Sequence, residues 1–157
     1  MIHLTPRRLG VAMAVALGCL PAFFAAAAQP AFKTEYFNGK VIPLAGLLEK
    51  QGAKLDADAA AHWMALVTDD GKVYTLVKDD STRMFFKDKA LLNRPLRLTG
   101  RLLPQTEILQ VVNVHSYLKG QLQEVYYWCE TCSIRALEPG DCACCNGKMV
   151  LREVPLP

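Results

Sequence analysis

The segment RPLRLTGRLL at residues 94–103 decides the fold class, because apolar and polar side chains alternate along it. Leucines fall at every second position on one side, with Gly100 in their row, and arginines and a threonine fall on the other side. This period of two predicts a β-strand with one buried and one solvated face. Gly100 predicts a bend or bulge within the strand, a feature that lets a small sheet curl.

Before this strand, the chain alternates between β-rich and helical patterns. The stretch YFNGKVIPL at 36–44 predicts a strand, and leucines at i, i+3 and i+4 spacing over 44–52 predict a short helix that ends at a glycine. Asp56 can cap a second helical turn. The stretch WMALVTDDGKVYTLV at 63–77 is the strongest hairpin signal, because two β-rich runs flank a D-D-G-K turn.

After the strand at 94–103, two runs predict further strands, ILQVVNV at 108–114 and QLQEVYYW at 121–128. Between the hairpin and the strand at 94–103, the stretch RMFFKDKALLN at 83–93 predicts a short strand at 84–86 and one or two helical turns at 88–92. Taken in order, these elements predict a mostly β protein. Its main part is expected to be a small five-stranded barrel of the OB type with short helices.

Residues 1–28 predict an export signal, which is set aside before the fold is considered. Arg7 and Arg8 form a positively charged start, and residues 9–28 are small or apolar without any charge. The run ends in A-A-A-A-Q, which fits a cleavage site that leaves Gln29 as the first mature residue. We therefore expect an exported protein, located in the periplasm or outside the cell.

Three alternatives to simple cleavage remain open. Twenty apolar residues are long enough to span a bilayer uncleaved, which would anchor the protein in the inner membrane. The arginine pair after Thr5 and Pro6 resembles a twin-arginine signal. Cys19 in A-L-G-C could accept a lipid, although the apolar stretch after it fits a lipoprotein poorly.

The charge of the mature chain gives no sign of a nucleic-acid partner. The sequence has 18 Lys and Arg against 15 Asp and Glu, and two of the arginines lie in the leader, so residues 29–157 carry a formal charge of +1. A nearly neutral surface lacks the basic footprint of a nucleic-acid-binding protein. The length predicts one OB-like domain at 29–118 and a small cysteine module at 119–157.

Five of the six cysteines lie within 17 residues near the C-terminus. Cys129 and Cys132 form one C-x2-C turn, and Cys142 and Cys145 form a second turn of the same spacing nine residues later. Two such turns predict a tetrahedral four-cysteine metal site of the zinc-ribbon kind. Cys144 lies inside the second turn and is an alternative ligand.

Different chemistries compete for these cysteines. Four thiolates at this spacing favour a structural Zn²⁺ ion, but sulfur-rich sites also bind Cu(I) or iron–sulfur centres, and thiols can be redox-active. Disulfides are common outside the cytoplasm, yet an odd number of cysteines cannot be fully paired within one chain. Haem attachment is excluded, because Cys132 is followed by Ser133 where a histidine is required.

Other candidate side chains have simpler explanations. His62 and His115 lie beside predicted strands without the partners of a catalytic site. The acidic pairs lack the spacing of a calcium loop and suit turns and caps. Alternation separates Tyr127 from Tyr126 and Trp128, so at least one of the three is expected in the core. The sequence therefore predicts no catalytic residue and no cofactor-binding residue.

The segment DGKVYTLVKDD…NRPLRLTGRLLPQTEILQVVNV resembles the OB-fold pattern of exported bacterial proteins, and this likeness covers residues 36–115. With its cysteines, the mature chain resembles a group of uncharacterised exported bacterial proteins that join an OB-like barrel to a C-terminal CxxC…CxCC metal-binding module. The resemblance implies an architecture and supplies no activity.

From these patterns we expect a noncatalytic binding or structural protein that holds zinc through its cysteines. Its partner is expected to be an extracytoplasmic protein or small ligand, and contact with a membrane only through an uncleaved signal. The alternative is a copper-handling or thiol-redox protein that uses the same cysteine cluster.

Overall fold

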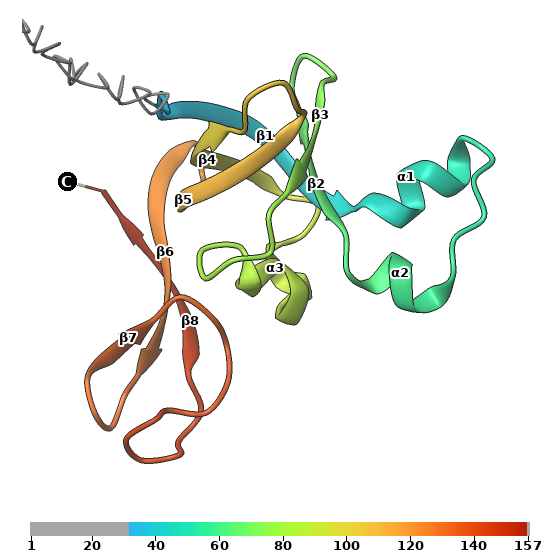
Figure 1. Cartoon of the computed structure of the whole chain (residues 1–157). Coiled ribbons are helices and arrows are strands. Elements are labelled where there is room, and N and C mark those ends of the chain that lie inside the picture. Colours follow the sequence, from blue (N-terminus) through green and yellow to red (C-terminus); the bar gives the residue numbers. More distant parts are fainter. Residues whose placement is uncertain (1–31, 157) are drawn as a thin grey trace, which may run out of the picture. The chain divides into compact units, whose positions relative to one another are not determined.

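Strands dominate the part of the chain that the computed structural model describes, residues 32–156 (Figure 1). The strands are β1 (Glu35–Pro43), β2 (Met64–Thr68), β3 (Val73–Leu76), β4 (Pro95–Leu102), β5 (Ile108–Leu118), β6 (Gln121–Cys129), β7 (Ile134–Ala136) and β8 (Val150–Pro155). The helices are α1 (Leu44–Lys50), α2 (Ala57–Ala61), α3 (Arg83–Lys87) and the 3-10 helix η1 (Lys89–Leu91). The predicted mostly β class with a few short helices is confirmed.

The predicted leader and its cleavage site lie outside the described residues, together with Cys19. Among the described helices, none has the length and apolar character needed to cross a bilayer.

Strands β1 to β5 form a closed ring. The antiparallel order β3-β2-β1-β4-β5 is completed by a parallel pairing between β3 and β5, in which Thr75 lies opposite Ile108 and Leu76 opposite Leu109. A sheet that closes on itself has no open edge along the ring. The predicted five-stranded, OB-like arrangement is therefore confirmed as a ring of these strands.

The apolar row predicted in 94–103 faces the inside of this ring. Leu96 and Leu98 on β4 are fully buried, and they belong to a core cluster with residues from every strand of the ring. Gly100 lies where the register of β4 and β5 shifts, so the predicted bulge is confirmed. A Cβ atom at Gly100 would lie 2.6 Å from the carbonyl oxygen of Gln110, which leaves room only for glycine at this close approach.

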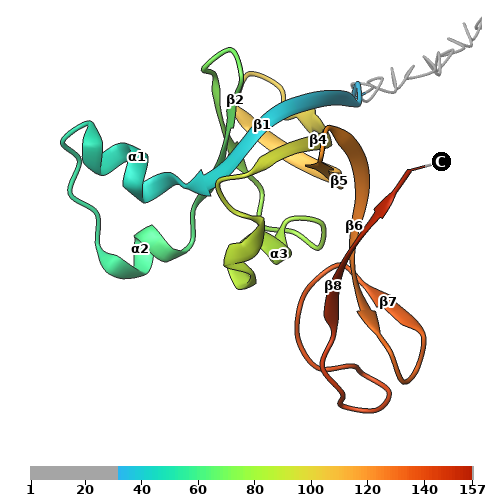
Figure 2. The same ribbon diagram turned by 180° about the vertical axis from the view of Figure 1, so that it is seen from behind.

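The connection between β1 and β2 contains the helices α1 and α2. In both views they project from the ring on the side away from β7 and β8 (Figures 1 and 2). Helix α1 matches the helix predicted over 44–52, and Gly52 after it has a positive φ of 90°. The backbone N–H of Ala60 donates to the carbonyl of Asp56 at the start of α2, in agreement with the predicted second helical turn.

The strand predicted at 84–86 is wrong, because this stretch is part of helix α3. Met84 and Phe85 are both buried against the core, and adjacent residues of a strand would point to opposite faces. Thr82 precedes the helix, and its buried hydroxyl donates to the carbonyl of Val77 at 2.5 Å, which fixes the turn into α3. The helical turns predicted at 88–92 are confirmed as η1.

Strand β6 joins the ring to the cysteine-containing C-terminal segment. Its first residues pair with β5, its last residues pair with β7, and β8 pairs along its other edge. The predicted boundary between 118 and 119 falls at the turn from β5 to β6, and strand pairing continues across this turn. The described residues belong to one compact unit.

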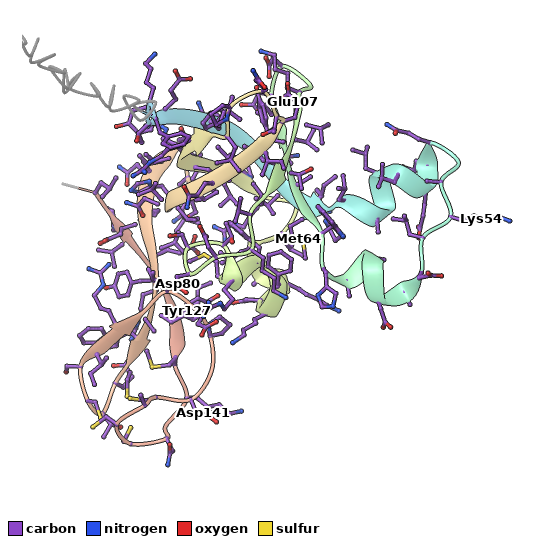
Figure 3. The ribbon with its side chains drawn as sticks, viewed as in Figure 1. Lys54, Met64, Asp80, Glu107, Tyr127 and Asp141 are labelled. Carbon is purple, nitrogen blue, oxygen red and sulfur yellow. The ribbon has the colours of Figure 1, made fainter. Side chains whose placement is uncertain are left out.

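Tyr127 lies on β6 next to α3, and its side chain is 1% exposed (Figure 3). Its hydroxyl donates to the Asp88 carboxylate at 2.8 Å, which links β6 to the segment between α3 and η1. The prediction that at least one of the three aromatic residues lies in the core is confirmed at Tyr127. Tyr126 and Trp128 point to the other face, where their rings meet edge to face at 6.3 Å.

Candidate metal centre

The two C-x2-C turns have the same backbone geometry. After the first, the N–H of Ser133 donates to the carbonyl of Cys129 at 2.8 Å, and Ser133 has a φ of 54°. After the second, the N–H of Asn146 donates to the carbonyl of Cys142 at 2.8 Å, and Asn146 has a φ of 58°. In both turns, the residue directly after the second cysteine therefore adopts a positive φ.

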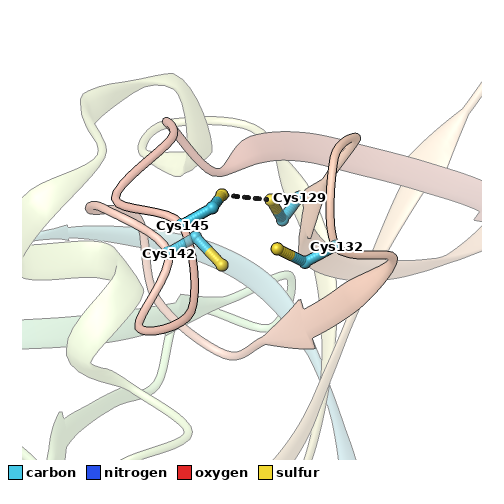
Figure 4. A group of neighbouring side chains, drawn as sticks. All are labelled: Cys129, Cys132, Cys142 and Cys145. Atoms are coloured by element: carbon cyan, nitrogen blue, oxygen red, sulfur yellow. Dashed lines mark hydrogen bonds between the residues drawn. The ribbon is translucent and has the colours of Figure 1, made fainter.

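The two turns face each other and bring four sulfur atoms together (Figure 4). The Sγ atoms of Cys129, Cys132, Cys142 and Cys145 all lie within 4.8 Å of one another, and those of Cys129 and Cys145 are 3.5 Å apart. A tetrahedral zinc ion with Zn–S bonds of about 2.3 Å separates its sulfur ligands by about 3.8 Å. The four thiols therefore form a cluster that could hold a metal ion.

The same distances do not fit a disulfide in this conformation. An S–S bond is about 2.05 Å long, far shorter than the 3.5 Å between the sulfurs of Cys129 and Cys145. The five cysteines from Cys129 onward are free thiols.

The sulfur cluster has a buried side and an open side. Cys129 is 1% exposed and Cys142 is 2% exposed, while Cys132 is half-buried and Cys145 is exposed. The protein therefore covers two of the thiols, and solvent reaches the others. An ion could enter or leave from the side of Cys145.

Backbone amides of the second turn point at its sulfur atoms. Those of Cys145 and Cys144 donate to the Cys142 sulfur and lower the pKa of this thiol to about 7. The N–H of Gly147 donates to the Cys145 sulfur at 3.4 Å. Amide donors stabilise the thiolate, which is the form that binds a metal.

In the first turn, the surroundings raise the pKa of the thiols. The thiols of Cys144 and Cys145, together with burial, raise the pKa of Cys132. The backbone amide of Cys132 lowers the pKa of Cys129, but burial and the nearby thiols outweigh it and raise that pKa. Crowded sulfur atoms thus resist ionisation on their own, and a bound cation would reverse this preference.

Cys144 is separate from the group of four. Its side chain is exposed and lies close enough to Cys132 to affect the pKa of that thiol, but its sulfur is outside the set that lies within 4.8 Å. The alternative ligand predicted from the sequence is therefore a neighbour of the cluster.

The other predicted candidates lie away from the cysteines. His62 is exposed, and His115 is a half-buried strand residue whose pKa is lowered by burial and by Arg97. Asp70 belongs to the β2–β3 turn, where it accepts a hydrogen bond from Thr68 and pairs with Lys72. Neither histidine belongs to the sulfur cluster.

Contacts that connect the C-terminal segment to the ring had no signal in the sequence. Glu138, in the loop between the cysteine turns, pairs with Lys87 at 2.9 Å and with Arg83 at 3.6 Å, both on α3. Glu153 on β8 pairs with Arg94 at the start of β4. Charged residues far apart in the chain carry no pattern that would identify their partners.

In comparisons with known proteins, no family model, no curated protein and no solved structure matches the chain. The mostly β fold and the cysteine cluster are thus established by the structure itself, and the resemblance to exported bacterial proteins stays a prediction.

Proposed function

We propose that the chain is an exported, noncatalytic binding protein in which Cys129, Cys132, Cys142 and Cys145 hold a structural zinc ion. The observation that carries this proposal is the matched geometry of the two cysteine turns, which place four sulfur atoms within 4.8 Å. A ligand set supplied entirely by protein is the hallmark of a structural zinc site, whereas catalytic zinc keeps an open position for water or substrate.

The chemistry of the donors favours zinc over other metals. Four sulfur atoms in a tetrahedral arrangement suit zinc or an iron–sulfur centre, and oxygen-seeking ions such as calcium and magnesium are disfavoured. The four sulfur atoms lie within 4.8 Å of one another, which suits a single ion at their centre better than a cluster of several iron atoms. Cu(I) is the remaining competitor, because soft thiolates also select it.

The metal would act as a clamp on the C-terminal segment. Cys129 ends β6, and Cys142 and Cys145 lie in the loop before β8, so a shared ion ties this loop to β6. Binding of structural zinc supplies on the order of 10 kcal/mol in small zinc modules, enough to order a segment with little core of its own. The clamp would thereby keep Glu138 and Glu153 in place against the ring.

The predicted leader at 1–28 and the formal charge of +1 over the mature chain bear on the partner. They favour an extracytoplasmic protein or small ligand, and they disfavour nucleic acid. A membrane would be involved only through an uncleaved leader.

A second candidate function is copper handling or thiol exchange. The exposed Cys144 next to Cys132 favours it, because a purely structural site has no need of a fifth thiol. In this case Cys144 would receive a metal from, or pass it to, the cluster, or react with a disulfide of another protein.

Elemental analysis of the protein purified from the export compartment separates the two candidates. Thiol titration before and after chelation is run on the same sample. One zinc ion per chain, with four thiols protected until chelation and one reactive throughout, supports the structural site. Copper in place of zinc, or thiols that cycle between reduced and oxidised forms, supports handling. Disulfides that do not exchange with added thiols, in a protein without bound metal, would refute both.

A further inference from the structure

The outward face of the ring carries a group of four side chains on β1, β4 and β5, which we call the Arg97 patch. It consists of Tyr36, Asn38, Arg97 and Tyr117. Asn38 and Arg97 are direct partners in the register of β1 and β4, and Arg97 lies opposite His115 in the register of β4 and β5. The patch is thus built on three paired strands and is far from the cysteine cluster along the chain.

The neighbours of Arg97 hold its side chain in one orientation. The centre of its guanidinium group lies 5.7 Å from the ring centre of Tyr36 and 5.6 Å from that of Tyr117, within the range of cation–π attraction. Its Nε donates to Asn38 Oδ1 at 3.2 Å, and the Tyr117 hydroxyl donates to the same oxygen at 3.1 Å. A guanidinium group fixed in this way loses little conformational entropy when it binds a ligand.

The terminal nitrogens of Arg97 remain available. Within residues 32–156, none of the ion pairs includes Arg97, and its hydrogen bond to Asn38 uses only Nε. Arg135 differs on this point, although it also stacks on a tyrosine, because it is neutralised by Glu124 at 2.6 Å. The two terminal nitrogens of an arginine offer parallel N–H donors that can bind both oxygens of a carboxylate, which is bidentate binding.

The surroundings of Arg97 suit a protein partner. Tyr36 is 71% exposed, more than any other large hydrophobic residue among those described, and its contact with Arg97 leaves most of the ring open. Tyrosine and arginine are the residue types that dominate binding energy at protein interfaces. Tyr36 and Asn38 also line a cleft of about 360 Å³ in which Glu35, Asp69 and Asp70 outnumber Lys72, so the contact with a carboxylate is confined to Arg97.

We propose that the Arg97 patch binds the carboxylate of an aspartate or glutamate side chain on a partner protein. The proposal names the partner contact of the binding protein inferred above and rests on that function. Among the described arginines, Arg97 and Arg101 on β4 are the two outside every ion pair, whereas Arg135 and Arg152 on the same sheet are paired with Glu124 and Glu130. Of these two, Arg97 is the one held between two tyrosines, which argues for a single carboxylate. A nucleic-acid strand would need a row of free cations to follow its phosphates.

The test uses the full-length, metal-loaded protein and an array of synthetic ten-residue peptides. Each peptide is present with a central glutamate and, as a matched form, with glutamine at the same position. We expect a subset of peptides to bind at least about tenfold more tightly as the glutamate form, because a charge-assisted, two-pronged bond is lost in the other. Arg97→Lys should reduce this preference to about threefold or less, since lysine cannot form the paired bond.

Arg135→Lys is the matched control, because it makes the same change on the same sheet face at an arginine that already has an acidic partner. It should leave the glutamate preference unchanged. Thermal unfolding of both variants is recorded alongside, since a purely structural role of Arg97 would alter stability without altering the choice between the two peptide forms.

Three results would overturn the proposal: no peptide prefers glutamate, Arg97→Lys keeps the preference, or inorganic phosphate or single-stranded DNA displaces the bound peptide at lower concentration than free glutamate peptide does. Zinc content is measured in each variant. If Arg97→Lys loses the preference for glutamate peptides but keeps its zinc, the effect comes from the Arg97 patch and not from the metal site. Absence of zinc from the wild-type protein would instead count against the proposed function.

Discussion

Arg94 and Glu153 form a two-pronged ion pair, in which Nη2 lies 2.5 Å from Oε1 and Nη1 lies 3.3 Å from Oε2. Both side chains are largely shielded from solvent, with 23% and 18% of their surfaces exposed. The hydroxyl of Ser116 also donates to the Glu153 carboxylate. One residue of β8 thereby contacts the start of β4 and the inner face of β5, which fastens the C-terminal strand to the ring.

Replacing Glu153 by Gln should lower the free energy of unfolding by about 2 kcal/mol, because the Arg94 charge loses its partner in a half-buried position. Glu130→Gln is the control, since Glu130 pairs with Arg152 at an exposed site. That change should cost no more than about 0.5 kcal/mol. Denaturant titration of both variants checks the difference, and equal losses would mean that the Arg94 pair adds nothing beyond a surface contact.

If the proposed zinc site is correct, Cys129→Ser should abolish metal binding and expose the loop between the two cysteine turns, because a buried thiol at the end of β6 is lost. The ring has its own core and should keep most of its far-UV circular dichroism signal. Limited proteolysis and metal analysis measure the effect.

Cys144→Ser serves as the comparison, since Cys144 lies outside the group of four. It should retain one metal ion per chain and resist protease like the wild type. Metal loss in both variants would show that Cys144 is a true ligand, and retention in both would remove Cys129 from the site.

Gly100→Ala should destabilise the ring by about 2 kcal/mol, because the added methyl group would meet the Gln110 carbonyl oxygen at 2.6 Å and the Leu109 side chain at 2.8 Å. Gly46→Ala is the opposite case. A Cβ atom at this position of α1 meets no other atom within 4 Å, and alanine favours a helix over glycine by about 1 kcal/mol. The melting temperature should fall for the first variant and stay level or rise for the second.

Stability should decrease above about pH 10, where a tyrosine in the unfolded chain ionises. Burial and the bond to Asp88 raise the pKa of Tyr127 in the folded state, so folding favours the protonated phenol. This contribution is complete below the unfolded pKa and is lost as the pH rises toward the folded one. Unfolding measured from pH 8 to 11 should therefore show a downward slope.

Tyr127→Phe should flatten that slope and cost about 1 kcal/mol at neutral pH through the lost hydrogen bond. Tyr36→Phe should leave the slope as it is, since Tyr36 is 71% exposed. If both variants behave like the wild type at high pH, Tyr127 does not ionise on unfolding in the way described.

Strands could be predicted wherever apolar and polar residues alternate, as in 94–103. Residues two apart in a strand point to the same face, so the alternation itself shows which face is buried. The stretch around Met84 and Phe85 could not be assigned in this way. Both residues are buried in the core from one short helix, and an apolar pair of that length fits a strand or a helix equally well.

For the metal centre, the spacing of the cysteines was enough to predict the four that come together, because two residues between cysteines form one tight turn in either half. The role of the fifth cysteine was not resolved by spacing. The position of Cys144 outside the cluster depends on how the two cysteine turns face each other, and these turns are separated in the chain by β7 and the loop after it.

The sequence by itself determined the alternation of β4, the β2–β3 turn and the two cysteine turns, all of which depend on interactions within a few residues of the chain. Only the tertiary structure decided that β3 and β5 close the ring, that Tyr127 binds Asp88, and that Glu153 reaches Arg94 across 59 residues. These contacts join segments that have no local preference for one another. They exist because burying the shared apolar core brings them together, and that is a property of the whole chain.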